Sequence, residues 1–111
     1  MLFCIMVNYT PEAIQSLMTN PETSRLSAVQ KVVEAAGGKV VSLYSTVAEG
    51  PGAMVIADLP DPISPPAISG VVAASGAVKD VRLMRLLSQD EVVAVRKKAA
   101  QLRDVYKGPG K

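Results

Sequence analysis

Two short segments of the sequence are apolar on both of the faces that a β-strand presents to its surroundings. In residues 2–9 the two alternating sets are Phe3, Ile5, Val7 and Cys4, Met6, Asn8. In residues 53–59 they are Ala53, Val55, Ala57 and Met54, Ile56, Asp58. An antiparallel sheet with one face in water alternates apolar with polar residues, and these two segments do not. We therefore expect a sheet whose two faces are both covered.

Turn and capping residues predict the elements of the N-terminal half. Thr10 is a good N-cap residue and Pro11 a good first helical residue, so a helix is expected after the first strand. Asn20-Pro21 interrupts that helix, because a residue before proline disfavours the helical conformation, and we expect Pro21 to open a second helix. Gly37-Gly38 then closes the helical region, with one glycine in the left-handed conformation.

Later in the chain the same kinds of signal predict three more strands and two more helices. The strands fall at 39–47, 53–59 and 78–87, and the helices at 64–75 and 89–106. A Gly/Pro loop at 48–52 joins the first two of these strands as a hairpin. Ser64 is expected to cap the first of these helices, and Ser88 with Glu91 forms a capping box at the start of the second.

The predicted order is therefore β-α-β-β-α-β followed by one extra helix. Two β-α-β units that share a hairpin form the ferredoxin-like arrangement, an α+β fold with a four-stranded antiparallel sheet and helices on one face. A chain of 111 residues fits one such core. We expect a single domain over 1–106 and a flexible tail over 107–111.

The length also decides what covers the second face of the sheet. A chain of 111 residues is too short for a second full helical layer. We therefore expect a second copy of the chain to cover that face, in a homo-oligomer of at least two chains. The alternative is that the last helix folds back over the sheet within one chain.

The face away from the helices is expected to carry a ligand site. Alternation brings to it Asn8, Ser42 and Tyr44, and also Asp58, Asp80 and Arg82 if the strand register permits. An amide, a phenol, a guanidinium and a carboxylate in an apolar cleft suit a small molecule, so the candidate ligand-binding residues are Asn8, Tyr44, Asp58 and Arg82. The alternative is structural: Arg82 pairs with Asp80 or Asp58 across strands, and Tyr44 is an interface aromatic.

Missing residue types exclude several kinds of chemistry. The sequence has no His, no Trp and one Cys, which excludes a His-based triad, a Cys/His zinc site and an internal disulfide. The carboxylates are scattered without metal-binding spacing, so neither a metal nor a cofactor is expected. Cys4, in a strand, is expected to be a small buried hydrophobe. Residues 49–52 join two strands and match no phosphate-binding motif.

Basic residues gather towards the C-terminus. Up to Val78 there are 3 Lys/Arg and 6 Asp/Glu, against 9 and 4 from Lys79 onward. The last predicted helix and its end carry Arg96, Lys97, Lys98, Arg103 and Lys107. Either these basic side chains bind an anionic partner, or they form the solvated face of an amphipathic helix. A net charge of only +2 and few aromatics argue against a dedicated nucleic-acid partner.

No stretch matches a secretory leader or a membrane helix, since the apolar run at 2–7 is too short and residues 62–78 hold three prolines. We therefore expect no membrane partner and a cytoplasmic location. The lone cysteine is in keeping with a reducing compartment.

Four short motifs resemble the GYD-domain family of small bacterial and archaeal proteins. They lie at 7–10, 37–39, 43–46 and 54–61, and the resemblance extends over about 3–91. The Gly-Tyr-Asp of the family's name is absent, because Gly50-Pro51-Gly52 stands in its place, so no role of that Tyr and Asp carries over. The resemblance implies a ferredoxin-like fold of the dimeric α+β-barrel type and no particular activity.

These observations support two main hypotheses of function. The first is a small homo-oligomeric ligand-binding or regulatory module with its site on the sheet face. The second is a cofactor-free enzyme of the dimeric α+β-barrel kind, a small monooxygenase or isomerase, which usually needs an acid/base that is often His. A third, anion or nucleic-acid binding by the last helix, rests on its charge alone.

Overall fold

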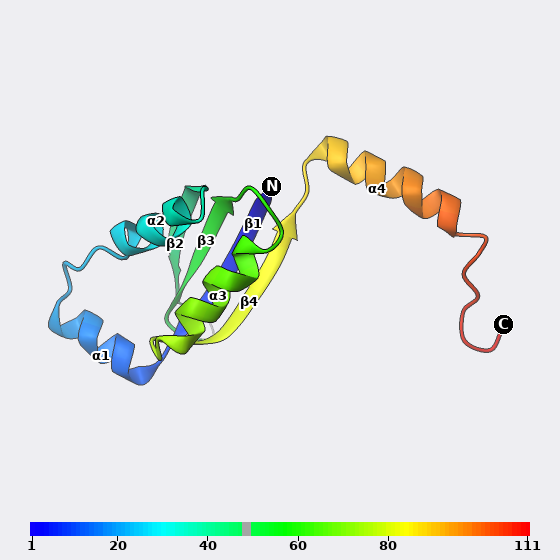
Figure 1. The fold of residues 1–111 in the computed structure, drawn as a ribbon. Helices are drawn as coiled ribbons and strands as arrows, with labels where there is room; N and C mark the ends of the chain where they lie inside the picture. The colour runs from blue at the N-terminus through cyan, green and yellow to red at the C-terminus, as the bar shows by residue number, and fades with distance from the viewer. Residues whose placement is uncertain (48–49) are drawn as a thin grey trace.

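The computed structural model describes residues 1–47 and 50–111. The elements in order are β1 (Leu2–Tyr9), α1 (Pro11–Thr19), α2 (Arg25–Ala35), β2 (Lys39–Thr46), β3 (Gly52–Asp58), α3 (Ser64–Ala74), β4 (Val78–Leu86) and α4 (Gln89–Leu102) (Figure 1). The predicted order of elements and the α+β, ferredoxin-like fold class are confirmed. Of the predicted loop at 48–52, residues 48 and 49 lie outside the described residues.

The four strands form one antiparallel sheet in the order β2-β3-β1-β4. Its two central strands, β1 and β3, are the two segments that are apolar on both faces. Phe3 lies opposite Ala57 and Ile5 opposite Val55. These central strands have neighbours on both sides, so only the two faces of the sheet remain to be covered.

Helices α2 and α3 cover one face of the sheet (Figure 1). The buried cluster beneath them comprises Phe3, Ile5, Val33, Val55, Ala57, Leu59 and Ile68. Burying one large aliphatic or aromatic side chain contributes roughly 1.5–3 kcal/mol, so this cluster holds the helices to the sheet. α2 packs chiefly on β2 and α3 on β4, the two edge strands.

The start of the first helix is confirmed and that of the second is wrong. The Thr10 hydroxyl accepts a hydrogen bond from the backbone N–H of Ala13 at 3.3 Å, with Pro11 at the first helical position. α2 begins at Arg25, not at Pro21, and the hydroxyl of its N-cap Ser24 accepts from the N–H of Ser27 at 3.3 Å. Pro21 instead lies in the turn between the helices.

The end of α2 follows the sequence prediction. Gly37 has a φ of +87°, and its N–H donates to the Glu34 carbonyl at 2.9 Å. The N–H of Gly38 donates to the Val33 carbonyl at 3.0 Å. Together these two bonds form a Schellman motif, in which the left-handed residue is almost always glycine.

The predicted cap of α3 is wrong. Ser64 is the first residue of the helix, and the Asp61 carboxylate accepts from the backbone N–H groups of Ile63 at 2.9 Å and of Ser64 at 2.7 Å. The N–H of Ser64 is the main reason why the pKa of Asp61 lies below its usual value. The Asp61 carboxylate therefore pairs the free backbone N–H groups at the start of the helix. Pro65 and Pro66, which come next, have no N–H to pair.

Helix α4 extends away from the sheet, and none of its residues is buried (Figure 1). Its capping box at Ser88 and Glu91 is confirmed. The helix ends at Leu102, short of the predicted Tyr106. The alternative in which the last helix folds back over its own sheet is wrong in this structure. The division into a domain at 1–106 and a tail at 107–111 stays a prediction.

Candidate functional site

The face of the sheet opposite α2 and α3 is here called the open face. Because Phe3 and Ile5 belong to the core beneath the helices, the residues that alternate with them face the other way. Strand register then assigns to the open face Leu2, Cys4, Met6, Asn8, Lys39, Ser42, Tyr44, Thr46, Gly52, Met54, Ile56, Asp58, Lys79, Arg82, Met84 and Leu86. No described helix packs over this face (Figure 1).

The middle of the open face is apolar and rich in sulfur. Met6 lies opposite Met54, and Cys4 lies between Ile56 and Met84. The prediction for Cys4 is confirmed: its side chain is 4% exposed, it forms no disulfide, and burial raises the pKa of its thiol. Thioethers are flexible and polarizable, so a methionine-rich surface adapts its shape to what it contacts.

Two of the four candidate residues lie at opposite edges of the open face. Tyr44 pairs with Met54, Met54 with Met6, and Met6 with Arg82, which makes one row across the four strands. Three strand spacings separate its ends by about 14 Å. Within one chain, Tyr44 and Arg82 therefore belong to opposite edges of the sheet, with two methionines between them.

Asn8 lies at one end of the open face beside Asp80. The Asn8 amide donates to the Asp80 carboxylate at 3.4 Å. Asp80 has a φ of +54°, at the bulge where the register between β1 and β4 shifts. Asp tolerates this left-handed conformation better than most residues, and a bulge redirects the side chains next to it. The structure thus brings together an amide and a carboxylate that the sequence could place only loosely.

Asp58 lies at the other end of the open face, opposite Leu2. The Met1 ammonium group donates to its carboxylate at 2.9 Å, and this bond is the main reason why the pKa of Asp58 lies below its usual value. Along β3, Asp58 is about 20 Å from the end that holds Asn8. Within the described ranges, Arg82 pairs with neither Asp58 nor Asp80, which contradicts the structural alternative for Arg82.

A second candidate lies on the helix-covered side of the sheet, and sequence reasoning missed it. A cavity of about 240 Å³ lies between α2 and α3, over the two central strands. From α2 it is lined by Arg25, Ala28, Val29 and Val32, and from α3 and its C-cap by Ile68, Val71, Val72 and Ser75. Both sets have the i, i+3, i+4, i+7 spacing of one helix face. The signal was therefore present, but that spacing ordinarily indicates closed packing.

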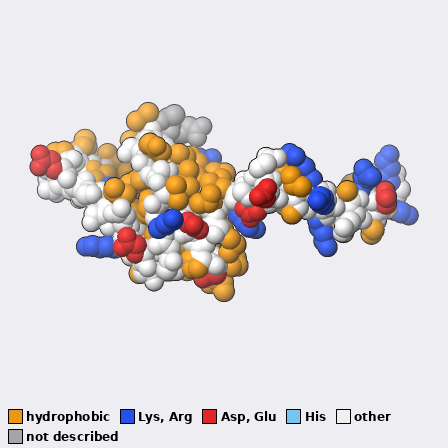
Figure 2. Space-filling model, turned by 90° about the horizontal axis from the view of Figure 1, so that it is seen from above, with side chains coloured by type: hydrophobic (Ala, Val, Ile, Leu, Met, Phe, Trp, Pro, Cys, Tyr) orange, Lys and Arg blue, Asp and Glu red, His pale blue; other side chains and the backbone are white. Residues whose placement is uncertain are grey.

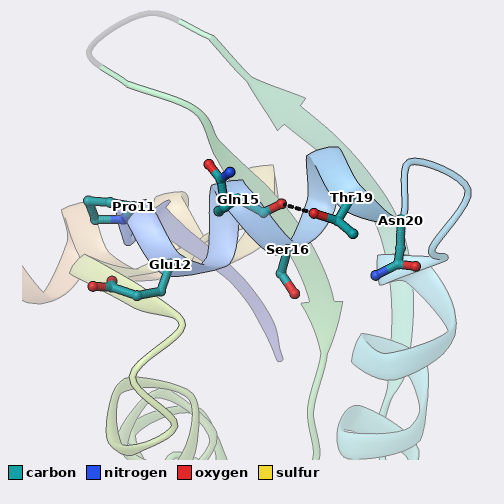
Figure 3. A pocket seen from close by; sticks show the side chains of 6 residues that line it. All are labelled: Pro11, Glu12, Gln15, Ser16, Thr19 and Asn20. Atoms are coloured by element: carbon teal, nitrogen blue, oxygen red, sulfur yellow. Dashed lines mark hydrogen bonds between the residues drawn. The ribbon is translucent and has the colours of Figure 1, made fainter.

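A larger hollow of about 570 Å³ lies beside α1 (Figure 3). All of its lining residues belong to α1 or its end: Pro11, Glu12, Gln15, Ser16, Thr19 and Asn20. All six are exposed, and besides the backbone bonds of the helix the Thr19 hydroxyl donates to the Gln15 carbonyl at 3.0 Å. Since no second element closes it, we regard this hollow as open surface rather than a site.

The basic C-terminal segment is solvated. Lys and Arg side chains are spread along the protruding arm with hydrophobic ones between them (Figure 2). At its base the Arg85 guanidinium pairs with the Glu91 carboxylate at 2.6 Å, and Glu91 also accepts from the Ser88 N–H at 3.1 Å. Along α4 itself, Val95 and Leu102 are more than half exposed. The arm is thus an amphipathic helix, and no described residue buries its apolar side.

The chain matches a known protein family. A family model described as the GYD domain matches residues 3–95. No curated protein matches the chain. Among the described residues there is no group of three or more Cys, Asp or Glu side chains placed to hold a metal ion. Nor, in the ranges 1–47 and 50–111, is any helix both long and apolar enough to cross a bilayer.

Proposed function

The chain belongs to the GYD domain family, and from that premise we propose that it is a homo-oligomeric ligand-binding or regulatory module with its site on the open face. One observation carries the proposal: the centre of that face is apolar, and no described element of the same chain packs over it. A second copy of the chain supplies that layer. Two sheets packed face to face then enclose a pocket that neither copy forms alone.

The size of the open face supports a contribution from α4 to the same interface. Four strands of about eight residues present roughly 500 Å². A stable interface buries about 800 Å² on each partner, so the sheet alone falls short. The exposed apolar side of α4, with Val95 and Leu102, supplies additional area when it packs on a neighbouring copy.

The polar candidates lie around the apolar centre rather than within it. Asn8 is at one end, Asp58 at the other, and Tyr44 and Arg82 are at the two edges. In a symmetric dimer each of them occurs twice, so groups from both copies surround one enclosed space. We propose that Asn8, Tyr44 and Arg82 orient a small polar molecule there, whereas the Asp58 carboxylate is hydrogen-bonded to the Met1 ammonium group.

A cofactor-free enzyme on the same face is the second proposal. It is supported by Asp80, whose carboxylate accepts from Asn8 and whose backbone has the left-handed conformation. Residues other than glycine are uncommon in this conformation, and they cluster at functional sites. In that case Asp80 acts as the acid–base group that other such enzymes take from His.

We also propose a cytoplasmic location, which the free thiol of Cys4 supports. Native mass spectrometry of the purified protein tests the main proposal. The expected result is an assembly of two or more chains that carries a small molecule released on dissociation. A monomer without any bound molecule, at micromolar concentration and low salt, would overturn it.

A further inference from the structure

The cavity between α2 and α3 has a structural cause. α2 packs chiefly on β2 and α3 chiefly on β4, so the two helices lie over the edges of the sheet. The central strands beneath the gap contribute Ile5, Val7, Ala53 and Val55 as a floor. The walls are the two apolar helix faces. The space of about 240 Å³ thus results from how far apart the edge strands hold the helices.

Burial divides the cavity into a closed part and a mouth. Ile5, Val55 and Ile68 are each no more than 8% exposed and line its deep part. Val71 is 65% exposed and, with Arg25, lies at the surface. A ligand can therefore enter between the helices without separating either one from the sheet.

The polar lining residues all lie at one end of the cavity. Only Tyr9, Arg25 and Ser75 have polar side chains among the residues that line it. Tyr9 ends β1, Arg25 begins α2, and Ser75 follows the last residue of α3. Each of these helices runs opposite to the strand that follows it. The start of α2 and the end of α3 therefore both lie at the end of the sheet where Tyr9 pairs with Val78. The other end is lined by aliphatic side chains alone.

We propose that this cavity binds a small aliphatic carboxylate, with the chain in the apolar part and the carboxylate at Arg25. A guanidinium matches a carboxylate with two parallel N–H···O bonds, and Tyr9 adds a hydroxyl at the same end. Within the described residues Arg25 forms no ion pair, so its charge is available. The site lies on the opposite side of the sheet from the open face and does not depend on the function proposed there.

The volume sets the size of the ligand. An apolar protein cavity of about 150 Å³ holds benzene, which has six non-hydrogen atoms. In proportion, a cavity of about 240 Å³ holds a ligand of about ten non-hydrogen atoms. Octanoate has that size, and octanamide has the same shape without the charge.

Isothermal titration of octanoate and of octanamide into the full chain tests the proposal, with amide chemical shifts read in parallel. We expect one octanoate per chain and shifts concentrated at the cavity residues of α2 and α3. Affinity is expected to rise roughly fourfold for each methylene from butanoate to octanoate and to level off beyond, because each buried methylene contributes a similar transfer free energy.

Three variants make the test specific. Arg25→Gln is expected to weaken octanoate by about tenfold or more and octanamide much less, since only the carboxylate loses a bidentate ion pair with the guanidinium. Lys31→Gln, on the same helix but outside the cavity, is the matched control and is expected to change neither. Ala28→Leu, which fills the cavity, is expected to abolish binding of both ligands.

Three results would overturn the proposal. The first is no octanoate binding at millimolar concentration. The second is equal weakening by Arg25→Gln and Lys31→Gln, which would indicate general charge attraction. The third is a set of shifts confined to the open face, around Met6 and Met54, which would assign the ligand to the site proposed there.

Discussion

Tyr44 lies directly opposite Met54 on the neighbouring strand, and its side chain is 62% exposed. The Tyr44 ring extends the apolar surface of the sheet, and a contiguous exposed apolar surface of this kind marks an interaction site. The pair marks the edge at which the open face passes from apolar centre to polar rim. In the proposed assembly a second copy of the chain covers this pair, which accounts for the exposure of Tyr44 in a single chain.

Replacing Tyr44 by Ala is expected to weaken self-association by about thirtyfold or more, the cost typical of an aromatic anchor residue in an interface. The free energy of unfolding of the isolated chain is expected to change by no more than about 0.5 kcal/mol, since the ring has few contacts within its own chain. Sedimentation velocity across a dilution series measures the first quantity, and urea denaturation of dilute protein the second. A large loss of chain stability with unchanged association would assign Tyr44 to the fold instead.

The core is expected to depend on the residue that follows β3. Leu59 is 1% exposed, and Leu59→Ala is expected to lower the free energy of unfolding by about 2–5 kcal/mol, because it leaves a cavity beneath the helices. Leu26→Ala is the matched control, because it makes the same substitution at a leucine that is 41% exposed. We expect it to lower the free energy of unfolding by less than about 1 kcal/mol. Urea denaturation measures both, and similar losses would contradict the core assignment.

Gly38 is required by close packing. A Cβ at this position would collide with the backbone carbonyl oxygen of Asp58 and with a methyl group of Leu59. Gly38→Ala is therefore expected to cost about 1–3 kcal/mol of stability.

The matched control is Gly70 in α3, where an added Cβ meets no atom within 4 Å. Gly70→Ala is expected to raise stability by up to about 1 kcal/mol, since alanine favours the helix. Thermal unfolding of both variants distinguishes the positions, and a Gly38→Ala protein as stable as the parent would contradict the packing described here.

The pKa of Asp61 gives stability a pH dependence of known sign. The N–H groups of Ser64 and Ile63 hold its folded pKa below the value in the unfolded chain. The stabilisation that ionised Asp61 gives the folded chain is therefore fully present above the pKa of Asp61 in the unfolded chain, near 4. It is lost as the pH falls through the lower pKa of Asp61 in the folded chain. Asp61→Asn keeps a capping acceptor and cannot titrate.

Melting temperatures between pH 6 and pH 2 provide the measurement. We expect the parent protein to lose more stability over this interval than Asp61→Asn does, with the two curves diverging below about pH 4. Parallel curves would show that the cap contributes nothing to the acid sensitivity of the fold.

The fold could be predicted because its signals are local. The order of elements follows from signals that each act within a few residues: the short apolar segments at 2–9 and 53–59, the glycines at 37 and 38, and the capping box at Ser88. The Asp61 cap was missed because a proline-rich helix start hides which upstream side chain reaches its N–H groups. The start of α2 was missed because Pro21 fits a turn as well as a first helical position.

The candidate sites were harder to predict, for a different reason. Which residues share the open face follows from alternation, but the distance between Tyr44 and Arg82 depends on strand order, a non-local property. The hydrogen bond between Asn8 and Asp80 depends on a bulge with no sequence signature of its own. The cavity depends on how the edge strands separate two helices, whereas their apolar stripes also suit closed packing.

A comparison of two methionine variants by sedimentation equilibrium tests most directly whether the open face is an interface. Met54 lies in the centre of that face, whereas Met18 on α1 is 64% exposed and away from the sheet. We expect the parent protein and Met18→Lys to form the same assembly, and Met54→Lys to sediment as a single chain of 11.6 kDa that stays folded by circular dichroism. A parent protein that is itself a monomer, or a Met54→Lys variant that assembles as the parent does, would contradict the proposal.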